Sequence, residues 1–359
     1  MSKDVGIVIL FGSGETLDSG RKIQRNVLMT LPRNQHVAIL ETPAGFQPNS
    51  AAVAQELAEV FRQSLQEFVT DVTVVPARKK GTVYSPDDED IIAPLEQASY
   101  IILGPGSPTY AATQLQNSKA LESLKRRWEQ GATLVLSSAA AIASGEFVLP
   151  VYEIYKAGHD LCWEKGLRLF SDIGLPFSVV THWDNTDGGE KLDTSHCFMG
   201  EKRFMRLYEL FPKDKPLLCI DEHTAAIFYF SQDVFSVEGK GTLTLLLENR
   251  PTTFDHGKTY SISAIVNGEK KEVVLKRLQE KSVKEIAYTR DIPDDVLVLL
   301  EKRKQAKEEK DFITADSIRD EVISHGYTVE DIAGEQKDGD QDESISKRGI
   351  SIVKNSSEF

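Results

Sequence analysis

The 359-residue sequence has few cysteines, no long apolar run near its start and no excess of positive charge. Its three cysteines, Cys162, Cys197 and Cys219, show no C-x-x-C spacing, so we expect reduced thiols rather than a disulfide framework. The apolar run before Gly12 has about seven residues, far fewer than the ~20 of a membrane helix, which argues against a signal peptide or a membrane span. The net charge of -13 disfavours a surface built for nucleic acid or anionic lipid, because neutralising phosphate requires clustered Lys and Arg. These absences predict a cytoplasmic protein with no membrane partner.

The first half of the sequence alternates short apolar runs with longer amphipathic segments of helical periodicity. The apolar runs are rich in Val, Ile and Leu and end in Gly, Pro or Ser; they lie within residues 5–15, 36–45, 71–78, 98–107 and 132–138. Strands that are buried on both faces read as continuous apolar runs. The pattern therefore predicts an α/β fold, a three-layer, doubly wound, mostly parallel sheet with helices on both faces. Ligands of such sheets bind beyond the carboxyl ends of the strands.

The chain divides into four predicted segments. Residues 1–265 form the α/β domain, whose last two strand-like runs, 216–230 and 234–247, are expected to be antiparallel strands at a sheet edge. Residues 266–290 form a connecting segment, and residues 291–334 a small, charged helical appendage. Residues 335–359 have almost no large apolar side chains and are predicted to be a disordered tail.

The segment GATLVLSSAAAIASGEF, residues 131–147, joins an apolar strand to a run of Ala, Ser and Gly. A strand that ends in a nucleophile and turns sharply into a helix needs small neighbours, because the backbone is strained and larger side chains would collide. Ser138 would then lie at the carboxyl end of the fifth strand, close to free N–H groups of the next helix. Close packing of a helix on the sheet explains the same small residues without any chemistry, and the glycines of G-x-S-x-G are missing.

The segment is one of five motifs that follow one another along the chain: GPGSPT (104–109), SSAAA (137–141), GLRL (166–169), VVTHW (179–183) and CIDEHTA (219–225). Together they resemble the cyanophycinase and dipeptidase E family of serine peptidases, over about residues 5–249. The resemblance implies a flavodoxin-like fold of the class I glutamine amidotransferase kind. It also implies hydrolysis of a small peptide or amide.

Carried over onto this sequence, the resemblance implies that Ser138 is the nucleophile and His182 the general base. It places the acidic partner some fifteen to eighteen residues past the serine, and Glu153 is the acidic residue at that distance. The backbone N–H groups of Gly106 and Ala139 would bind the oxyanion. In such a triad a neutral imidazole takes the proton of the hydroxyl, and a carboxylate holds the imidazole in the required tautomer.

Departures from the family's pattern leave alternatives open. The family's glycines two residues before and after the nucleophile are Leu136 and Ala140 here, and a Cβ at either place would crowd the turn and misdirect the serine. His196 follows in the same loop and competes with His182 for the role of base; His182 is favoured because it ends a strand-like run. His223 is interpreted as a turn residue near the sheet edge.

The polar loop after His182 is the expected specificity region. Trp183 and Asn185, with Ser107 from the Gly-rich turn, are expected to contact the substrate, and Arg203 to bind a substrate carboxylate. An ion pair of Arg203 with acidic neighbours on its own helix is the alternative. No H-x-H or H-E-x-x-H spacing supports a metal site, and residues 12–15 lack the glycine patterns of nucleotide binding. We therefore expect neither a metal nor a cofactor.

Residues 303–331 resemble the final segment of cysteinyl-tRNA synthetases, but no synthetase motif such as HIGH or KMSKS is present. We therefore do not expect tRNA charging; residues 291–334 would contact RNA or a protein, or serve only as a mixed-charge surface helix. Two functions remain open. One is a serine hydrolase acting on a small peptide or amide, as a monomer or a homodimer. The other is a catalytically degenerate amidotransferase-like domain that binds a ligand, RNA or a protein.

Overall fold

The computed structural model describes residues 5–273, 298–299, 302–303, 305–306, 311–325, 327–332 and 349–354. The chain forms two units, Met1–Val274 and Leu275–Phe359, which are described separately. The first unit extends past the predicted boundary at residue 265, because a β-bridge joins Tyr260 to Glu272. None of the helices in the described ranges has both the length and the hydropathy needed to cross a bilayer.

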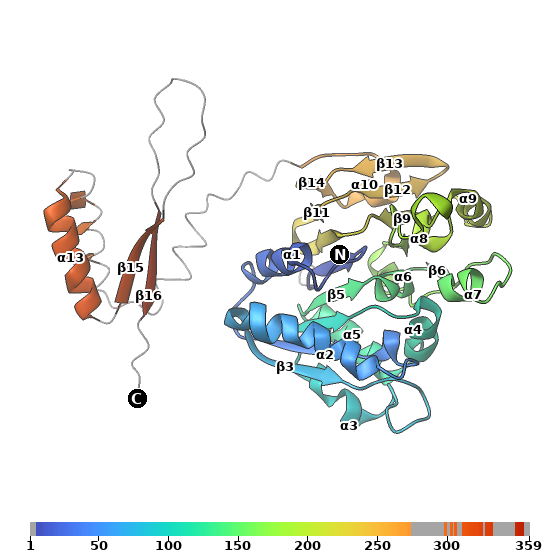
Figure 1. The fold of residues 1–359 in the computed structure, drawn as a ribbon, viewed down its shortest axis with the longest axis horizontal. Helices are drawn as coiled ribbons and strands as arrows, with labels where there is room; N and C mark the ends of the chain where they lie inside the picture. Colours follow the sequence, from blue (N-terminus) through green and yellow to red (C-terminus); the bar gives the residue numbers. More distant parts are fainter. Residues whose placement is uncertain are drawn as a thin grey trace, which may run out of the picture. The chain divides into compact units, whose positions relative to one another are not determined.

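A large mixed sheet forms the centre of the first unit (Figure 1). The five apolar runs of the first half become strands β1 to β5, which pair in parallel in the order β1-β5-β4-β2-β3. Strands β10, β11 and β14 extend the sheet beyond β1 with antiparallel pairs. The eight strands are β1 (Val8–Phe11), β2 (Gln35–Leu40), β3 (Val69–Val75), β4 (Tyr100–Leu103), β5 (Thr133–Ser137), β10 (Thr224–Tyr229), β11 (Val234–Gly239) and β14 (Lys258–Ser261). The predicted mixed α/β fold with a large, mostly parallel sheet is confirmed.

A second, four-stranded sheet was not predicted. Its order is β13-β12-β9-β8, with β8 parallel to β9 and the other pairs antiparallel. Run 216–230 was read as one strand, but it breaks at residues 221–223, so that β9 belongs to the small sheet and β10 to the large one. The strands are β8 (Ser178–Val180), β9 (Leu217–Ile220), β12 (Leu243–Leu247) and β13 (Arg250–Phe254), and a separate short pair is β6 (Phe147–Val148) with β7 (Glu164–Lys165).

Helices cover both faces of the large sheet. Within β1, Val8 and Leu10 join a buried cluster with residues of α4, α5 and α6, whereas Ile9 and Phe11 join another with residues of α1 and α2. The α-helices of this unit are α1 (Asp18–Leu28), α2 (Ser50–Glu59), α3 (Glu89–Ile92), α4 (Pro108–Leu115), α5 (Lys119–Glu129), α6 (Ala139–Ser144), α7 (Val151–Tyr155), α8 (Ser195–Phe198), α9 (Glu201–Glu209) and α10 (Ser263–Asn267). The short 3-10 and π turns are η1 (Thr42–Ala44), η2 (Val60–Ser64), η3 (Gln66–Phe68), η4 (Ala93–Glu96), η5 (Ser171–Ile173), η6 (Gly189–Lys191) and η7 (Phe230–Gln232).

The second unit contains helix α13 (Phe312–Ser324) and an antiparallel pair, β15 (Tyr327–Ile332) with β16 (Gly349–Lys354). Two predictions are corrected here. Strand β15 lies in the segment expected to be helical, and β16 lies in the stretch expected to be disordered. The predicted connecting segment lies, from residue 274 on, outside the described residues.

Candidate active site

Ser138 occupies a sharp turn between β5 and α6. Its φ of 50° and ψ of -108° lie where a side chain is rarely tolerated, and such strain costs about 1–3 kcal/mol. The Ser138 N–H donates to the carbonyl of Phe11 at 3.0 Å, and its carbonyl accepts from the N–H of Ile142 at 3.1 Å. Leu136 and Ala140 are both buried, and the turn remains tight with them in place. The crowding expected from these two Cβ atoms has therefore not relaxed it.

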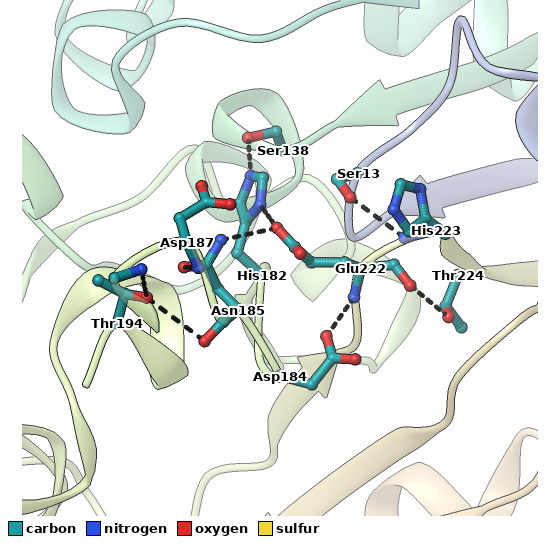
Figure 2. Close-up of polar contacts among 11 residues, drawn as sticks. Ser13, Ser138, His182, Asp184, Asn185, Asp187, Thr194, Glu222, His223 and Thr224 are labelled. Atoms are coloured by element: carbon teal, nitrogen blue, oxygen red, sulfur yellow. Dashed lines mark hydrogen bonds and ion pairs between the residues drawn. The ribbon is translucent and has the colours of Figure 1, made fainter. Parts of the chain in front are cut away.

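His182 follows β8 and points at Ser138 (Figure 2). The Ser138 hydroxyl lies 2.8 Å from His182 Nε2. His182 itself has a positive φ of 51°, so a second strained residue contributes to the pair. The structure thus brings together the expected nucleophile and the favoured one of the two candidate bases.

The carboxylate that contacts His182 belongs to Glu222. Parallel pairing of β8 with β9 sets Val180 beside Cys219, so the residues that follow each strand lie at the same sheet edge. Glu222 Oε1 lies 2.8 Å from His182 Nδ1. An ionised carboxylate only accepts hydrogen bonds, so Nδ1 carries the proton and Nε2 is left as the acceptor for the Ser138 hydroxyl. This hydrogen bond from His182 is the main cause of a lowered pKa of Glu222.

Two residues of the loop after His182 hold Glu222 in place. The side-chain amide of Asn185 donates to Glu222 Oε1 at 2.9 Å, and the backbone N–H of Glu222 donates to Asp184 Oδ1 at 2.6 Å. Asn185 is only 2% exposed. Asn185 was expected to contact the substrate, but in the structure it contacts the carboxylate that orients the histidine.

Glu153, the expected acidic partner, lies elsewhere. Its Oε1 accepts a hydrogen bond from the Thr109 hydroxyl at 2.5 Å, and Thr109 in turn lies 3.0 Å from the Ser107 hydroxyl. Helix α7 therefore directs Glu153 at the start of α4, and the carboxylate bonded to the imidazole comes from Glu222. The sequence shows only that Glu222 follows an apolar run; its closeness to His182 comes from the parallel pairing of β8 with β9.

The Gly106 loop and the Ser138 turn follow neighbouring parallel strands. Leu103 of β4 pairs with Leu136 of β5, so the expected oxyanion donors, the N–H groups of Gly106 and Ala139, come from the same edge of the sheet. A Cβ added to Gly106, whose φ is 154°, would lie 1.9 Å from the carbonyl oxygen of Pro43. The loop can take this path only with glycine at position 106.

Ser107 and Arg203 were expected to contact the substrate, and both have structural partners. The Ser107 hydroxyl caps α4 by accepting from the N–H of Tyr110 at 3.2 Å. Arg203 Nε donates to the carbonyl of Met199 at 2.9 Å, and its guanidinium lies 5.9 Å from the ring centroid of Tyr155. The bond from Arg203 to Met199 thus holds the end of the loop that follows His182.

Trp183, which was expected to contact the substrate, packs against His196, the alternative candidate base. The two rings meet edge to face, with their centroids 4.0 Å apart, and His196 stacks on Phe204 at 5.0 Å. His196 Nδ1 lies 2.7 Å from the Ser195 hydroxyl, and burial lowers the pKa of the imidazole. His196 thus packs between the rings of Trp183 and Phe204, whereas His182 is the histidine that reaches Ser138.

His223 lies in the turn between the two sheets, as interpreted from the sequence. Its backbone N–H donates to the Ser13 hydroxyl at 3.1 Å, which ties this turn to the loop after β1 (Figure 2). Within the described ranges, no group of three or more His, Cys, Asp or Glu side chains is placed to share a metal ion.

Solved structures resemble this chain in fold. The structure "Crystal structure of a peptidase from an acI-B1 Actinobacterium" aligns with 73% of this chain and 98% of its own, with a TM-score of 0.57 and 18% sequence identity. The fold is shared with a peptidase. A putative peptidase E protein from Listeria monocytogenes EGD-e covers 66% of this chain and 100% of its own, with a TM-score of 0.45 and 12% identity. At these identities the similarity concerns the fold alone.

The second unit resembles a different group of proteins. Residues 289–337 match the family described as "Cysteinyl-tRNA ligase anticodon binding domain". A cysteine–tRNA ligase from Chlamydia felis is 47% identical over 47 residues, 13% of this chain and 10% of the ligase. The ligase from Caldicellulosiruptor saccharolyticus is 48% identical over 58 residues, 16% of this chain and 12% of the ligase. The chain thus spans about a tenth of the length of these ligases, and the predicted C-terminal resemblance is confirmed.

Proposed function

We propose that the first unit is a serine-type peptidase or amidase of the cyanophycinase and dipeptidase E kind, with a layer arrangement like that of class I glutamine amidotransferases. The observation that carries this proposal is the chain of hydrogen bonds from the Ser138 hydroxyl through His182 to Glu222, which begins at a strained turn after a buried strand. The actinobacterial peptidase with the same fold supports it. The substrate would be a small peptide or amide.

The mechanism uses the three side chains in sequence. Ser138 Oγ attacks the carbonyl carbon of the amide while its proton passes to His182 Nε2, and Glu222 stabilises the resulting imidazolium without taking the proton itself. The N–H groups of Gly106 and Ala139 would hold the oxyanion. His182 then returns its proton to the leaving amine, which departs as the acyl-enzyme ester forms on Ser138. A water molecule, deprotonated by His182, hydrolyses this ester and restores the serine.

Labelling with a fluorophosphonate tests the proposal, because this reagent forms a covalent bond with an activated serine. We expect the wild type to be labelled on Ser138, as shown by mass spectrometry of the labelled peptide, and Ser138→Ala to be unlabelled. Ser137→Ala is the matched control, since Ser137 is its buried neighbour. Ser137→Ala should keep the label. Absence of labelling in the wild type, or equal labelling of wild type and Ser138→Ala, would contradict the mechanism and favour a degenerate binding domain.

The second unit supports a second candidate function, binding of RNA or of a protein partner. The match to the anticodon-binding family over residues 289–337 favours RNA. Those residues include 13 acidic and 8 basic side chains, so general attraction to phosphate is weak and binding would depend on specific contacts. We expect the full chain to retain bulk tRNA in a filter-binding assay and a chain ending at Val274 to lose it, while both are labelled by fluorophosphonate. Equal retention by both chains would dismiss the RNA function.

A further inference from the structure

Three aromatic rings gather around the first turn of α4. Phe46 lies 5.2 Å from Tyr110 and 6.4 Å from Tyr152, measured between ring centroids. We call these three residues the aromatic cluster. Phe46 is 47% exposed, whereas Tyr110 and Tyr152 are half-buried, so the cluster presents one open ring to solvent. Covering this ring with a ligand would remove apolar surface from water.

The aromatic cluster is joined directly to the loop that carries Gly106. The N–H of Ser107 donates to the carbonyl of Pro43 at 2.9 Å, and Phe46 follows three residues later along the same short turn. Tyr110 lies in the first turn of α4, immediately after this loop. The Glu153 carboxylate accepts from Thr109 and so ties α7, which carries Tyr152, to the same turn.

Two further rings, those of Tyr155 and Phe198, connect α7 to His182. Tyr155, one turn after Tyr152, lies 5.6 Å from Phe198, and Phe198 lies 5.8 Å from His182, measured between ring centroids. Helix α7 therefore carries aromatic residues that contact rings on both sides, toward the Gly106 loop and toward the imidazole. Helix α7 thus connects the cluster to the candidate active site through Tyr155 and Phe198.

The rings of the aromatic cluster are held in place by polar contacts. The Tyr110 hydroxyl donates to the carbonyl of Arg78 at 2.9 Å, and Lys156 Nζ lies 4.7 Å from the ring centroid of Tyr152. Phe46, with no polar group of its own, offers the open face. Fixed aromatic neighbours around one exposed ring suit a ligand group that stacks against it or meets it edge to face.

We propose that the aromatic cluster is a substrate subsite for an aromatic or large apolar side chain on the residue that supplies the acyl group. This inference rests on the proposed function. The acyl side is assigned because Gly106 would hold the oxygen of the acyl carbon and the side chain in question is attached one carbon away. Phe46 lies three residues past Pro43, whose carbonyl accepts from the N–H of Ser107, the residue after Gly106. The substrates would thus be small peptides or amides with a Phe-, Tyr- or Leu-like acyl residue.

Two diphenyl phosphonate esters, one built on phenylalanine and one on alanine, test the subsite, since both phosphonylate an active serine. We expect the wild type to react about tenfold faster with the phenylalanine ester, the size of effect that a well-placed aromatic contact gives. Phe46→Ala should bring the ratio of the two rates close to one, mainly by slowing the phenylalanine ester. Met29→Ala, which truncates a comparably exposed side chain at the end of α1, should keep the wild-type ratio.

The outcomes separate the subsite from the proposed function. If fluorophosphonate labels Ser138 but the two esters react equally fast, or Phe46→Ala keeps the preference, the subsite is refuted while the hydrolase stands. If fluorophosphonate does not label Ser138 at all, both fall. If Phe46→Ala instead converts a dimer to a monomer in sedimentation and leaves the ratio unchanged, the cluster is an interface between copies of this chain and the subsite is refuted.

Discussion

Replacing Glu222 gives the sharpest test of the candidate active site. In Glu222→Gln, the side-chain oxygen at the Oε1 position can still accept from both His182 Nδ1 and Asn185 Nδ2, because the Asn185 amide donates there in the wild type. The histidine then keeps its tautomer, and only the negative charge is lost. In Glu222→Ala no acceptor remains for Nδ1, so the tautomer is no longer fixed.

The two variants should therefore lose reactivity to different extents. A hydrogen bond to a charged group contributes about 1.5–3 kcal/mol and a neutral one about 0.5–1.5 kcal/mol, so losing the charge of Glu222 costs about 1.5 kcal/mol. That corresponds to a reaction about tenfold slower. A wrongly oriented or wrongly protonated base costs about 1000-fold or more, which is the loss expected for Glu222→Ala.

The assay is the second-order rate constant for inactivation by a fluorophosphonate. Glu153→Gln is the matched control, because it makes the same change at the acidic residue that the sequence resemblance favours. Since Glu153 contacts Thr109 rather than His182, its replacement should change the rate by no more than about threefold, the scatter expected away from the reacting groups. A larger loss in Glu153→Gln than in Glu222→Gln would refute the assignment of Glu222.

Three further predictions follow from the strained turn, the Gly106 loop and the Glu222 carboxylate. In urea titrations, the free energy of unfolding of Ser138→Gly should be about 1 kcal/mol higher than that of Ser138→Ala, because glycine accepts the positive φ at no cost. Equal free energies of unfolding would mean that the turn is unstrained. Gly106→Ala should slow fluorophosphonate inactivation by about 100-fold, because its Cβ would collide with Pro43 and displace the oxyanion donor; an unchanged rate would remove Gly106 from the mechanism. The pKa of Glu222 is lowered in the folded protein by the hydrogen bond from His182, so this group stabilises the fold above its ordinary pKa near 4.5 and the contribution is lost as the pH falls through the folded value. In urea titrations, the stability gap between wild type and Glu222→Gln should therefore be larger at pH 6 than at pH 3, and a gap independent of pH would contradict the pairing.

The large sheet was predictable because its parallel strands are buried on both faces. Each of β1 to β5 reads as an uninterrupted apolar run that ends in small residues, and the order of the runs gives the alternation with helices. The small sheet was missed because the chain passes from β9 to β10 within three residues, without a glycine or proline to mark the break. A change of sheet depends on tertiary packing, which the local sequence does not record.

The candidate site was predictable only in part, because one of its three residues is brought in by tertiary packing. Ser138 and His182 each follow a strand, so their places at the carboxyl ends could be predicted from local pattern, whereas their roles came from the family resemblance. Glu153 was expected because the family resemblance places the acidic residue at that distance past the serine, but the distance does not tell which way a side chain on α7 points. The residue that meets the imidazole, Glu222, is 84 positions from Ser138 in sequence, and its closeness comes from the pairing of β8 with β9.

The separation of Ser138 from Glu222 has a consequence during synthesis. Ribosomes add about 5–20 residues each second, so Ser138 is made several seconds before Glu222, the carboxylate that contacts His182. Until β9 has been translated and has docked beside β8, the imidazole of His182 lacks the carboxylate that fixes its tautomer. On the proposed mechanism, Ser138 is not yet activated at that stage. On the proposed mechanism, hydrolytic activity would therefore begin only when folding of this unit is almost finished.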